Sequence, residues 1–146
     1  MNATRRTYAC LMAGTFVATL LGGPASASTG ETPPTLDGAR TVTAAEAKGL
    51  LDKGGVLVLD VRRKAAFLDG RLPKAKGIAK NAETKAFDPA VFGANKDAML
   101  VVYGHGSDGW SAVDAVKTAV AAGYRNVSWL RGGWTEWSAA GLPVEQ

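Results

Sequence analysis

Cysteine is nearly absent from this sequence: the 146 residues contain a single one, Cys10. It lies within residues 1–27, a segment with early basic residues at Arg5 and Arg6, an apolar core, and small residues up to Ala27. This order is typical of a secretory signal peptide cleaved after Ala27, which predicts a periplasmic or secreted protein. The mature chain would then contain no cysteine, which excludes a disulfide, a thiolate metal site and a cysteine nucleophile.

The sequence also lacks a long apolar run and a large excess of one charge. The apolar core of residues 1–27 is too short for a comfortable membrane span, although an uncleaved N-terminal anchor is the alternative to cleavage. The formal net charge of +4 falls to +2 after cleavage, because the removed segment carries two arginines and no acidic residue. This mild charge does not indicate a nucleic-acid partner. We therefore expect neither nucleic acid nor a stable membrane span for the mature chain.

Histidine occurs once, as His105. A metal site needs further ligands and a general base needs a group to activate, and the neighbouring sequence offers neither. We interpret His105 as a solvent-facing loop residue, and we expect no metal and no cofactor.

The predicted mature chain is long enough to bury one hydrophobic core, which indicates one domain. Residues 28–40 are polar, contain paired prolines and show no periodicity, so they are predicted to form a flexible linker. The domain then occupies residues 41–146.

Short apolar runs at residues 56–60, 99–103 and 127–130 have the pattern of strands that are buried on both faces. Segments with helical signals separate these runs. Strands and helices that alternate at this length predict an α/β fold with a parallel sheet and helices on both faces.

Several helix boundaries have sequence signals. Thr43 and Glu46 have the spacing of a capping box, and so do Ser111 and Asp114. Asp88 precedes a proline, which predicts the start of a short helix. Near the C-terminus, tryptophans at positions 134 and 137 would share one helix face and cover the sheet.

Asp60 and Arg62 follow the strand at 56–60, and two interpretations remain open for them. They can line a site at the strand ends, or they can form a structural salt bridge. A scattered set of lysines is interpreted as solvated connections, with a binding patch for acidic partners as the alternative. These lysines lie at positions 74, 76, 80, 85 and 96.

A glycine-rich loop connects the strand at 99–103 to the next helix, where ligands bind in many α/β proteins. Its backbone N–H groups would lie at a helix N-terminus, which favours anions, whereas Asp108 and Asp114 would repel them. A simple glycine-rich turn is the alternative, and Trp110 is interpreted as a packing residue. The loop consists of Gly104, His105, Gly106, Ser107, Asp108, Gly109 and Trp110.

Two stretches resemble the rhodanese-like family: VLVLDVRRKAAFLDGRLPKAKGI, residues 56–78, and AAGYRNVSWLRGGWTEWSAAGLPV, residues 121–144. The resemblance extends over residues 40–146 and implies the rhodanese-like α/β fold. The turn at residues 70–75 departs from the family pattern, since its usual histidine and second glycine are missing.

The resemblance implies sulfur transfer through a persulfide on a cysteine directly after the central strand, and this position is Gly104. A second cysteine, which one exported subgroup carries, corresponds to Gly109, and the loop arginine of active members has no counterpart. We therefore expect a non-catalytic sulfurtransferase homologue, a pseudoenzyme, that binds a partner protein or a small oxyanion through the loop. The alternative is an enzyme of thiosulfate or sulfane sulfur handling that works without a cysteine persulfide.

Overall fold

The computed structural model describes residues 30–146, so the predicted signal peptide lies outside the described residues. Five parallel strands form one sheet in the order β1-β5-β4-β2-β3. The strands are β1 (Ala39–Val42), β2 (Val56–Asp60), β3 (Lys76–Gly77), β4 (Met99–Tyr103) and β5 (Asn126–Leu130). The predicted α/β class with a parallel sheet is confirmed.

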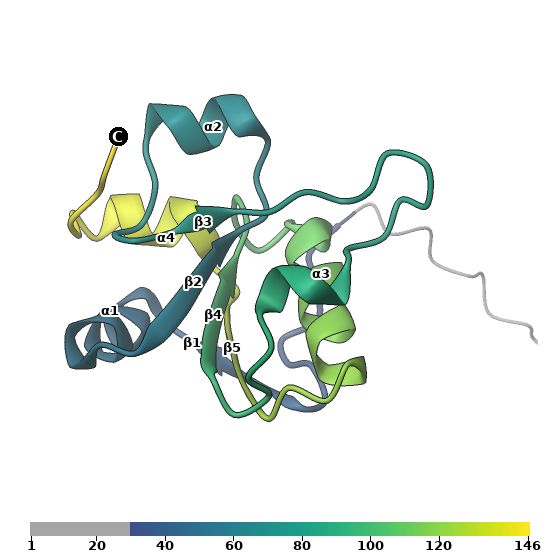
Figure 1. The fold of residues 1–146 in the computed structure, drawn as a ribbon. Helices are drawn as coiled ribbons and strands as arrows, with labels where there is room; N and C mark the ends of the chain where they lie inside the picture. The colour runs from purple at the N-terminus through teal and green to yellow at the C-terminus, as the bar shows by residue number, and fades with distance from the viewer. Residues whose placement is uncertain (1–29) are drawn as a thin grey trace, which may run out of the picture.

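Helices cover both faces of the sheet, as predicted, because the central strands are apolar on both sides (Figure 1). Along β4, Leu100 and Val102 face the helix α3, whereas Val101 and Tyr103 face the side of α1 and α4. The helical elements are α1 (Ala44–Lys53), α2 (Lys64–Asp69), the 3₁₀ helix η1 (Pro89–Phe92), α3 (Trp110–Ala121) and α4 (Gly133–Ala139).

The helix boundaries confirm two of the predicted caps and correct one. Thr43 and Glu46 form the capping box of α1, and the Asp88 side chain caps η1. The predicted cap at Ser111 is wrong, because α3 begins one residue earlier at Trp110 and has no side-chain cap. The glycine-rich loop thus continues directly into the helix, whose first-turn N–H groups lack a side-chain acceptor.

The two outer strands have no counterpart among the predicted strands. β1 includes Ala39 and Arg40, which the sequence placed in the linker, and the nearby Leu36 is buried in the core. β3 has only two residues, Lys76 and Gly77, and it forms the other edge of the sheet. Both strands pair on one side only, so neither shows the unbroken apolar run of a central strand.

Within residues 30–146, every helix falls short of the length and apolar character that a membrane crossing requires.

Candidate functional site

The glycine-rich loop, residues 104–110, lies where two neighbouring parallel strands end. β2 and β4 pair in register, and directly after them the Val61 N–H donates to the Tyr103 carbonyl at 3.1 Å. A hollow of about 460 Å³, which we call the loop hollow, lies between the end of β2 and the loop. It is lined by Val61, Arg62, Arg63, Gly104, His105, Asp108, Gly109, Trp110 and Ser111.

The first turn of α4 holds one side of the loop. The Trp134 N–H donates to the Gly104 carbonyl at 2.9 Å, and the Thr135 N–H and hydroxyl both donate to the His105 carbonyl at 2.8 Å. This approach needs a glycine at position 133, where φ is +56° and a Cβ would lie 2.4 Å from the Gly104 carbonyl oxygen.

The N-terminal segment, residues 30–34, holds the loop from a second side. The Thr32 N–H and hydroxyl donate to the Ser107 carbonyl at 2.7 and 2.6 Å, and the Trp110 indole donates to the Gly30 carbonyl at 2.9 Å. Arg131 fixes the segment, because its guanidinium donates to the carbonyls of Thr32 and Pro33. Thr32 is 2% exposed, so its two bonds to the Ser107 carbonyl are partly shielded from water, whereas the Trp110 bond to Gly30 is exposed.

These outside bonds determine where the loop N–H groups point. In a trans peptide the C=O and the following N–H point in opposite directions. The carbonyls of residues 104, 105 and 107 are bound from α4 and from residues 30–34, so the N–H groups of His105, Gly106 and Asp108 point away from those elements. None of these three N–H groups has an acceptor among residues 30–146. The loop therefore offers backbone donors of the kind that bind anions.

Gly104, which the resemblance relates to the family's cysteine, and Gly109, which it relates to the second cysteine of one exported subgroup, differ in the space around them. A Cβ at Gly104 would meet the Ala112 Cβ at 3.4 Å and the Val61 Cγ2 at 3.5 Å, which are ordinary contacts. A Cβ at Gly109 would lie 2.9 Å from the Gly106 carbonyl oxygen, which is too close. The backbone therefore accepts a side chain at 104 but needs a glycine at 109.

Charges around the loop hollow are mixed. Arg63 is exposed there and forms no ion pair within the described part of the chain, whereas Asp108 brings a negative charge to the same hollow. The twelve-residue α3 starts at this point, so its N-terminal partial charge adds to the positive side. His105 is exposed, and Asp114 binds Lys80.

Asp60 and Arg62, the other predicted site residues, form a buried ion pair behind the loop hollow. Asp60 is 0% and Arg62 is 7% exposed, and their charged groups are 2.7 Å apart. The Tyr103 hydroxyl donates to the Asp60 carboxylate and accepts from the Leu72 N–H at 3.1 Å. Arg62 also stacks its guanidinium on the Trp134 ring, 4.4 Å from the ring centre. Arg62 lines the hollow, whereas Asp60 is covered by protein.

The same network shifts two pKa values. Burial, and after it the negative charge of Asp60, raises the pKa of Tyr103 well above its usual value. Burial is the largest single influence on Arg62 and would lower its pKa, but hydrogen bonding to Asp60, the negative charge of that carboxylate and the interaction with Tyr103 together raise it. The network is therefore a neutral tyrosine beside a fixed ion pair.

The fold and the loop can now be compared with known proteins. Residues 43–140 match the rhodanese-like domain family. The chain belongs to this family. This rhodanese-like domain is 39% identical over 57 residues to the thiosulfate sulfurtransferase YnjE of Escherichia coli (strain K12), in an alignment that covers 39% of this chain and 13% of that protein. The chain thus matches only a small part of that relative's length.

Two solved structures superpose on most of the domain. The crystal structure of the Alr3790 protein from Anabaena sp. has a TM-score of 0.59 at 31% identity, over 71% of this chain and 90% of that one. The crystal structure of YnjE has a TM-score of 0.62 at 23% identity, over 73% of this chain and 30% of that one. The second likeness concerns the fold alone.

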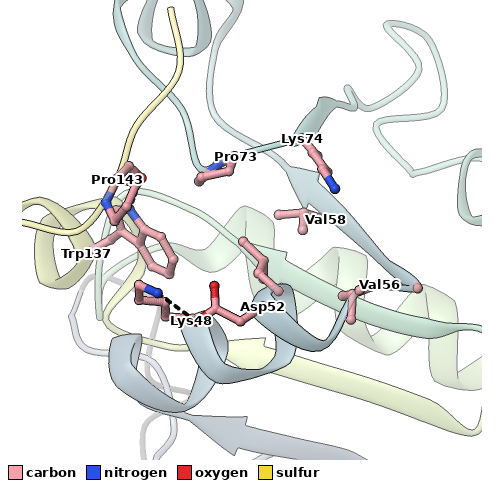
Figure 2. Close-up of a pocket in the computed structure, with 11 residues that line it drawn as sticks. Lys48, Asp52, Val56, Val58, Pro73, Lys74, Trp137 and Pro143 are labelled. Carbon is pink, nitrogen blue, oxygen red and sulfur yellow. Dashed lines mark hydrogen bonds and ion pairs between the residues drawn. The ribbon is translucent and has the colours of Figure 1, made fainter.

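A second recess lies on the face of the sheet that α1 and α4 cover, and it shares no residue with the loop hollow (Figure 2). Val56 and Val58 of β2 line it together with Trp137, in a volume of about 320 Å³. The ion pair of Lys48 and Asp52, 2.6 Å long, lies along its edge. Its lining is mostly apolar, with Lys48, which is paired with Asp52, and Lys74 as the basic residues.

Sequence reasoning found the loop itself but missed the residues that hold it. Thr32 and Thr135 give no signal of their own, because each is separated from its loop partner by many residues. Trp110 is half-buried, and its indole hydrogen bond fixes residues 30–34 to the loop.

Proposed function

We propose that this rhodanese-like domain binds a small oxyanion in the loop hollow and carries no catalytic nucleophile there. The observation that carries the proposal is that residues 104–108 lack a cysteine but keep free backbone N–H donors. The resemblance places the family's cysteine at Gly104, whereas the N–H groups of His105 and Asp108, which line the hollow, and of the neighbouring Gly106 are unbonded among residues 30–146. An anion site can persist without its nucleophile, because the backbone supplies the donors.

No other side chain in the loop replaces the cysteine. The Ser107 hydroxyl lies 3.4 Å from the Glu31 carboxylate, on the side of the N-terminal segment, and no histidine is bonded to it. A serine needs an adjacent base to act as a nucleophile at neutral pH. These contacts support a binding role over covalent catalysis.

The first probe is thiosulfate, because the curated relative YnjE is named a thiosulfate sulfurtransferase. Sulfate and phosphate test whether binding needs the outer sulfur atom. A ligand that binds only the native state stabilises it, so we expect about 50 mM thiosulfate to raise the melting temperature by roughly 3–6 °C if its Kd is about 10 mM. Sodium chloride at matched ionic strength is the reference.

Charge variants locate the binding. Arg63→Ala removes a positive charge from the hollow and is expected to reduce the thiosulfate-induced rise in melting temperature by at least about half. Asp108→Asn removes a negative charge there and is expected to increase that rise. Lys53→Ala, at the far end of α1, is the matched control. If no oxyanion raises the melting temperature, or if Lys53→Ala acts like Arg63→Ala, oxyanion binding by the loop is refuted.

A separate assay tests the absence of catalysis. We expect the purified protein to form thiocyanate from thiosulfate and cyanide no faster than buffer does. Turnover above buffer that disappears in Arg63→Ala would overturn the non-catalytic proposal. It would instead support sulfur transfer without a cysteine persulfide.

A further inference from the structure

A positively charged segment lies at the β3 edge of the sheet. Residues 61–80 contain seven basic residues and one acidic residue, Asp69, for a net charge of +6. The other described residues, 30–60 and 81–146, contain eight basic and twelve acidic residues, for a net charge of −4. The small net charge of the whole domain thus hides a strong separation of charge.

The segment folds into α2 and β3, which lie one above the other at this edge (Figure 1). Lys64 at the start of α2 and Lys76 in β3 are both exposed, and neither forms an ion pair within residues 30–146. They differ in this from Arg62 and Lys80, whose charges are matched by Asp60 and Asp114. Both lysines are therefore free to meet an external negative charge.

An apolar groove runs between α2 and β3. Its lining includes Lys64, Phe67, Leu68, Ile78 and Ala79, and its volume is about 320 Å³. Leu68 is 56% exposed, and no residue of the short helix α2 is buried. Lys64 is the free lysine that lines the groove, and Lys76 lies in β3, one residue before the lining residue Gly77. A large exposed apolar side chain beside a free cation is typical of an interaction surface.

We propose that this groove docks an acidic, extended segment of a partner protein, with an apolar side chain of the partner against Leu68. Charge complementarity selects an acidic partner, and the negative charge of the rest of the domain directs it to this edge. β3 is the outermost strand of the sheet, and only a polypeptide can use the backbone groups of a strand edge. The groove lies beside the loop hollow, since Arg62 lines both. The proposed docking in the groove does not depend on oxyanion binding in the hollow.

The test uses a fluorescein-labelled peptide of alternating glutamate and leucine, about eight residues long, which spans roughly 26 Å when extended. Fluorescence anisotropy with the purified protein measures its Kd. We expect binding that weakens as salt rises, and a loss of at least about tenfold in the Lys64→Glu/Lys76→Glu double variant. The matched control, Lys53→Glu/Lys117→Glu, makes the same change of net charge elsewhere and is expected to lose less than about threefold.

A second arm tests the apolar part of the groove. Leu68→Ser is expected to weaken the leucine-containing peptide at least about threefold and to leave an all-glutamate peptide unchanged, because only the first fills the groove. Amide chemical shifts in a titration should change at Phe67, Leu68, Ile78 and Ala79. Changes confined to residues 104–110 would instead assign the peptide to the loop and overturn the groove proposal.

Three other outcomes also overturn it. These are equal binding of both peptides, an equal loss in the control double variant, and no measurable peptide binding. Vesicles of phosphatidylglycerol and phosphatidylcholine are tested in parallel. Lysine-dependent binding to these vesicles in the absence of peptide binding would assign the surface to lipid instead. Thiosulfate stabilisation should persist in Lys64→Glu/Lys76→Glu, so the two proposals can fail separately.

Discussion

At the scale of single residues, Gly104 and Gly109, the two glycines that the resemblance relates to cysteines, differ in whether the backbone can accept a side chain. Gly104 has room for a Cβ and a φ that side chains can adopt, whereas a Cβ at Gly109 would collide with the Gly106 carbonyl oxygen. The missing nucleophile at 104 is therefore a change of chemistry and not of shape. Gly109 is a requirement of the turn, in which its own N–H donates to that carbonyl at 2.9 Å.

This difference predicts opposite results for two cysteine substitutions in a Cys10→Ala background. Gly104→Cys is expected to keep the melting temperature and to place a thiol at the start of α3, with a pKa below the free value of about 8.5. Gly109→Cys is expected to lower stability by roughly 1–3 kcal/mol, because the turn must open. The pH dependence of iodoacetamide alkylation gives the thiol pKa. An unshifted pKa in Gly104→Cys would contradict the proposed anion site.

At the scale of elements, the loop is held by segments that are distant in the sequence. Residues 30–34 and the first turn of α4 each bind its carbonyls from outside. We infer that Thr32 is a positioning residue: it fixes the Ser107 carbonyl and so directs the Asp108 N–H toward the site. The predicted linker thus contributes to the loop's geometry.

Thr32→Val tests this role, because valine keeps the shape and the N–H but removes the hydroxyl donor. The loss of one hydrogen bond is expected to cost about 1 kcal/mol of stability, and to reduce the thiosulfate-induced rise in melting temperature as well. Thr35→Val, at the exposed position directly after residues 30–34, is the matched control. A lower melting temperature with an unchanged thiosulfate effect would show that Thr32 only stabilises the fold.

Elements that are continuous in sequence could be predicted, and elements that depend on distant partners could not. The runs at 56–60 and 99–103 became β2 and β4 because strands buried on both faces must be apolar throughout. The edge strand β3 has two residues and both are exposed, so no periodicity distinguishes it. The α3 cap was misplaced because Ser111 and Asp114 have the right spacing, although the loop geometry starts the helix at Trp110.

The candidate site was predictable in the same limited sense. The seven loop residues follow from the change between an apolar run and a glycine-rich stretch. The donors that shape the loop do not, because Thr32 and Ser107 are 75 residues apart and neither has a local signal. The family resemblance identified the position of the missing cysteine, whereas composition alone showed only that residues 28–146 contain no cysteine.

At the scale of the whole molecule, one buried network joins the strands to the connections above them. Asp60 of β2, Tyr103 of β4 and the Leu72 N–H meet at the Tyr103 hydroxyl, and Arg62 adds a bond to the Gly70 carbonyl. Breaking a buried ion pair on one side leaves a charge without a partner. This network therefore stabilises the ends of β2 and β4, and the loop at residues 104–110 follows β4 directly.

The raised pKa of Tyr103 predicts how the stability of the domain depends on alkaline pH. The folded-state pKa of Tyr103 lies above the unfolded value of about 10. The neutral Tyr103 therefore contributes to the free energy of unfolding fully below about pH 10, and this contribution is lost as pH rises further. Tyr103→Phe removes this contribution and leaves the Leu72 N–H without its acceptor, at an expected cost of about 1–3 kcal/mol at pH 7.

Urea unfolding between about pH 8 and 11 measures the effect. We expect the difference in unfolding free energy between the native sequence and Tyr103→Phe to shrink above about pH 10, because only the native sequence retains the tyrosine. Tyr124→Phe leaves the Asp60 network intact and is the control. A constant difference between the native sequence and Tyr103→Phe over the whole range would contradict the raised pKa of Tyr103.

The free space at Gly104 also bears on how easily a mutation could introduce a thiol at this position. A glycine codon that ends in a pyrimidine becomes a cysteine codon by a single base substitution. At position 104 the new side chain would meet Ala112 and Val61 at ordinary contact distances. Where the codon of Gly104 ends in a pyrimidine, a single base substitution would introduce a loop thiol, and no second substitution would be needed to make room for it. The second cysteine position offers no such route, since the turn would have to be rebuilt first.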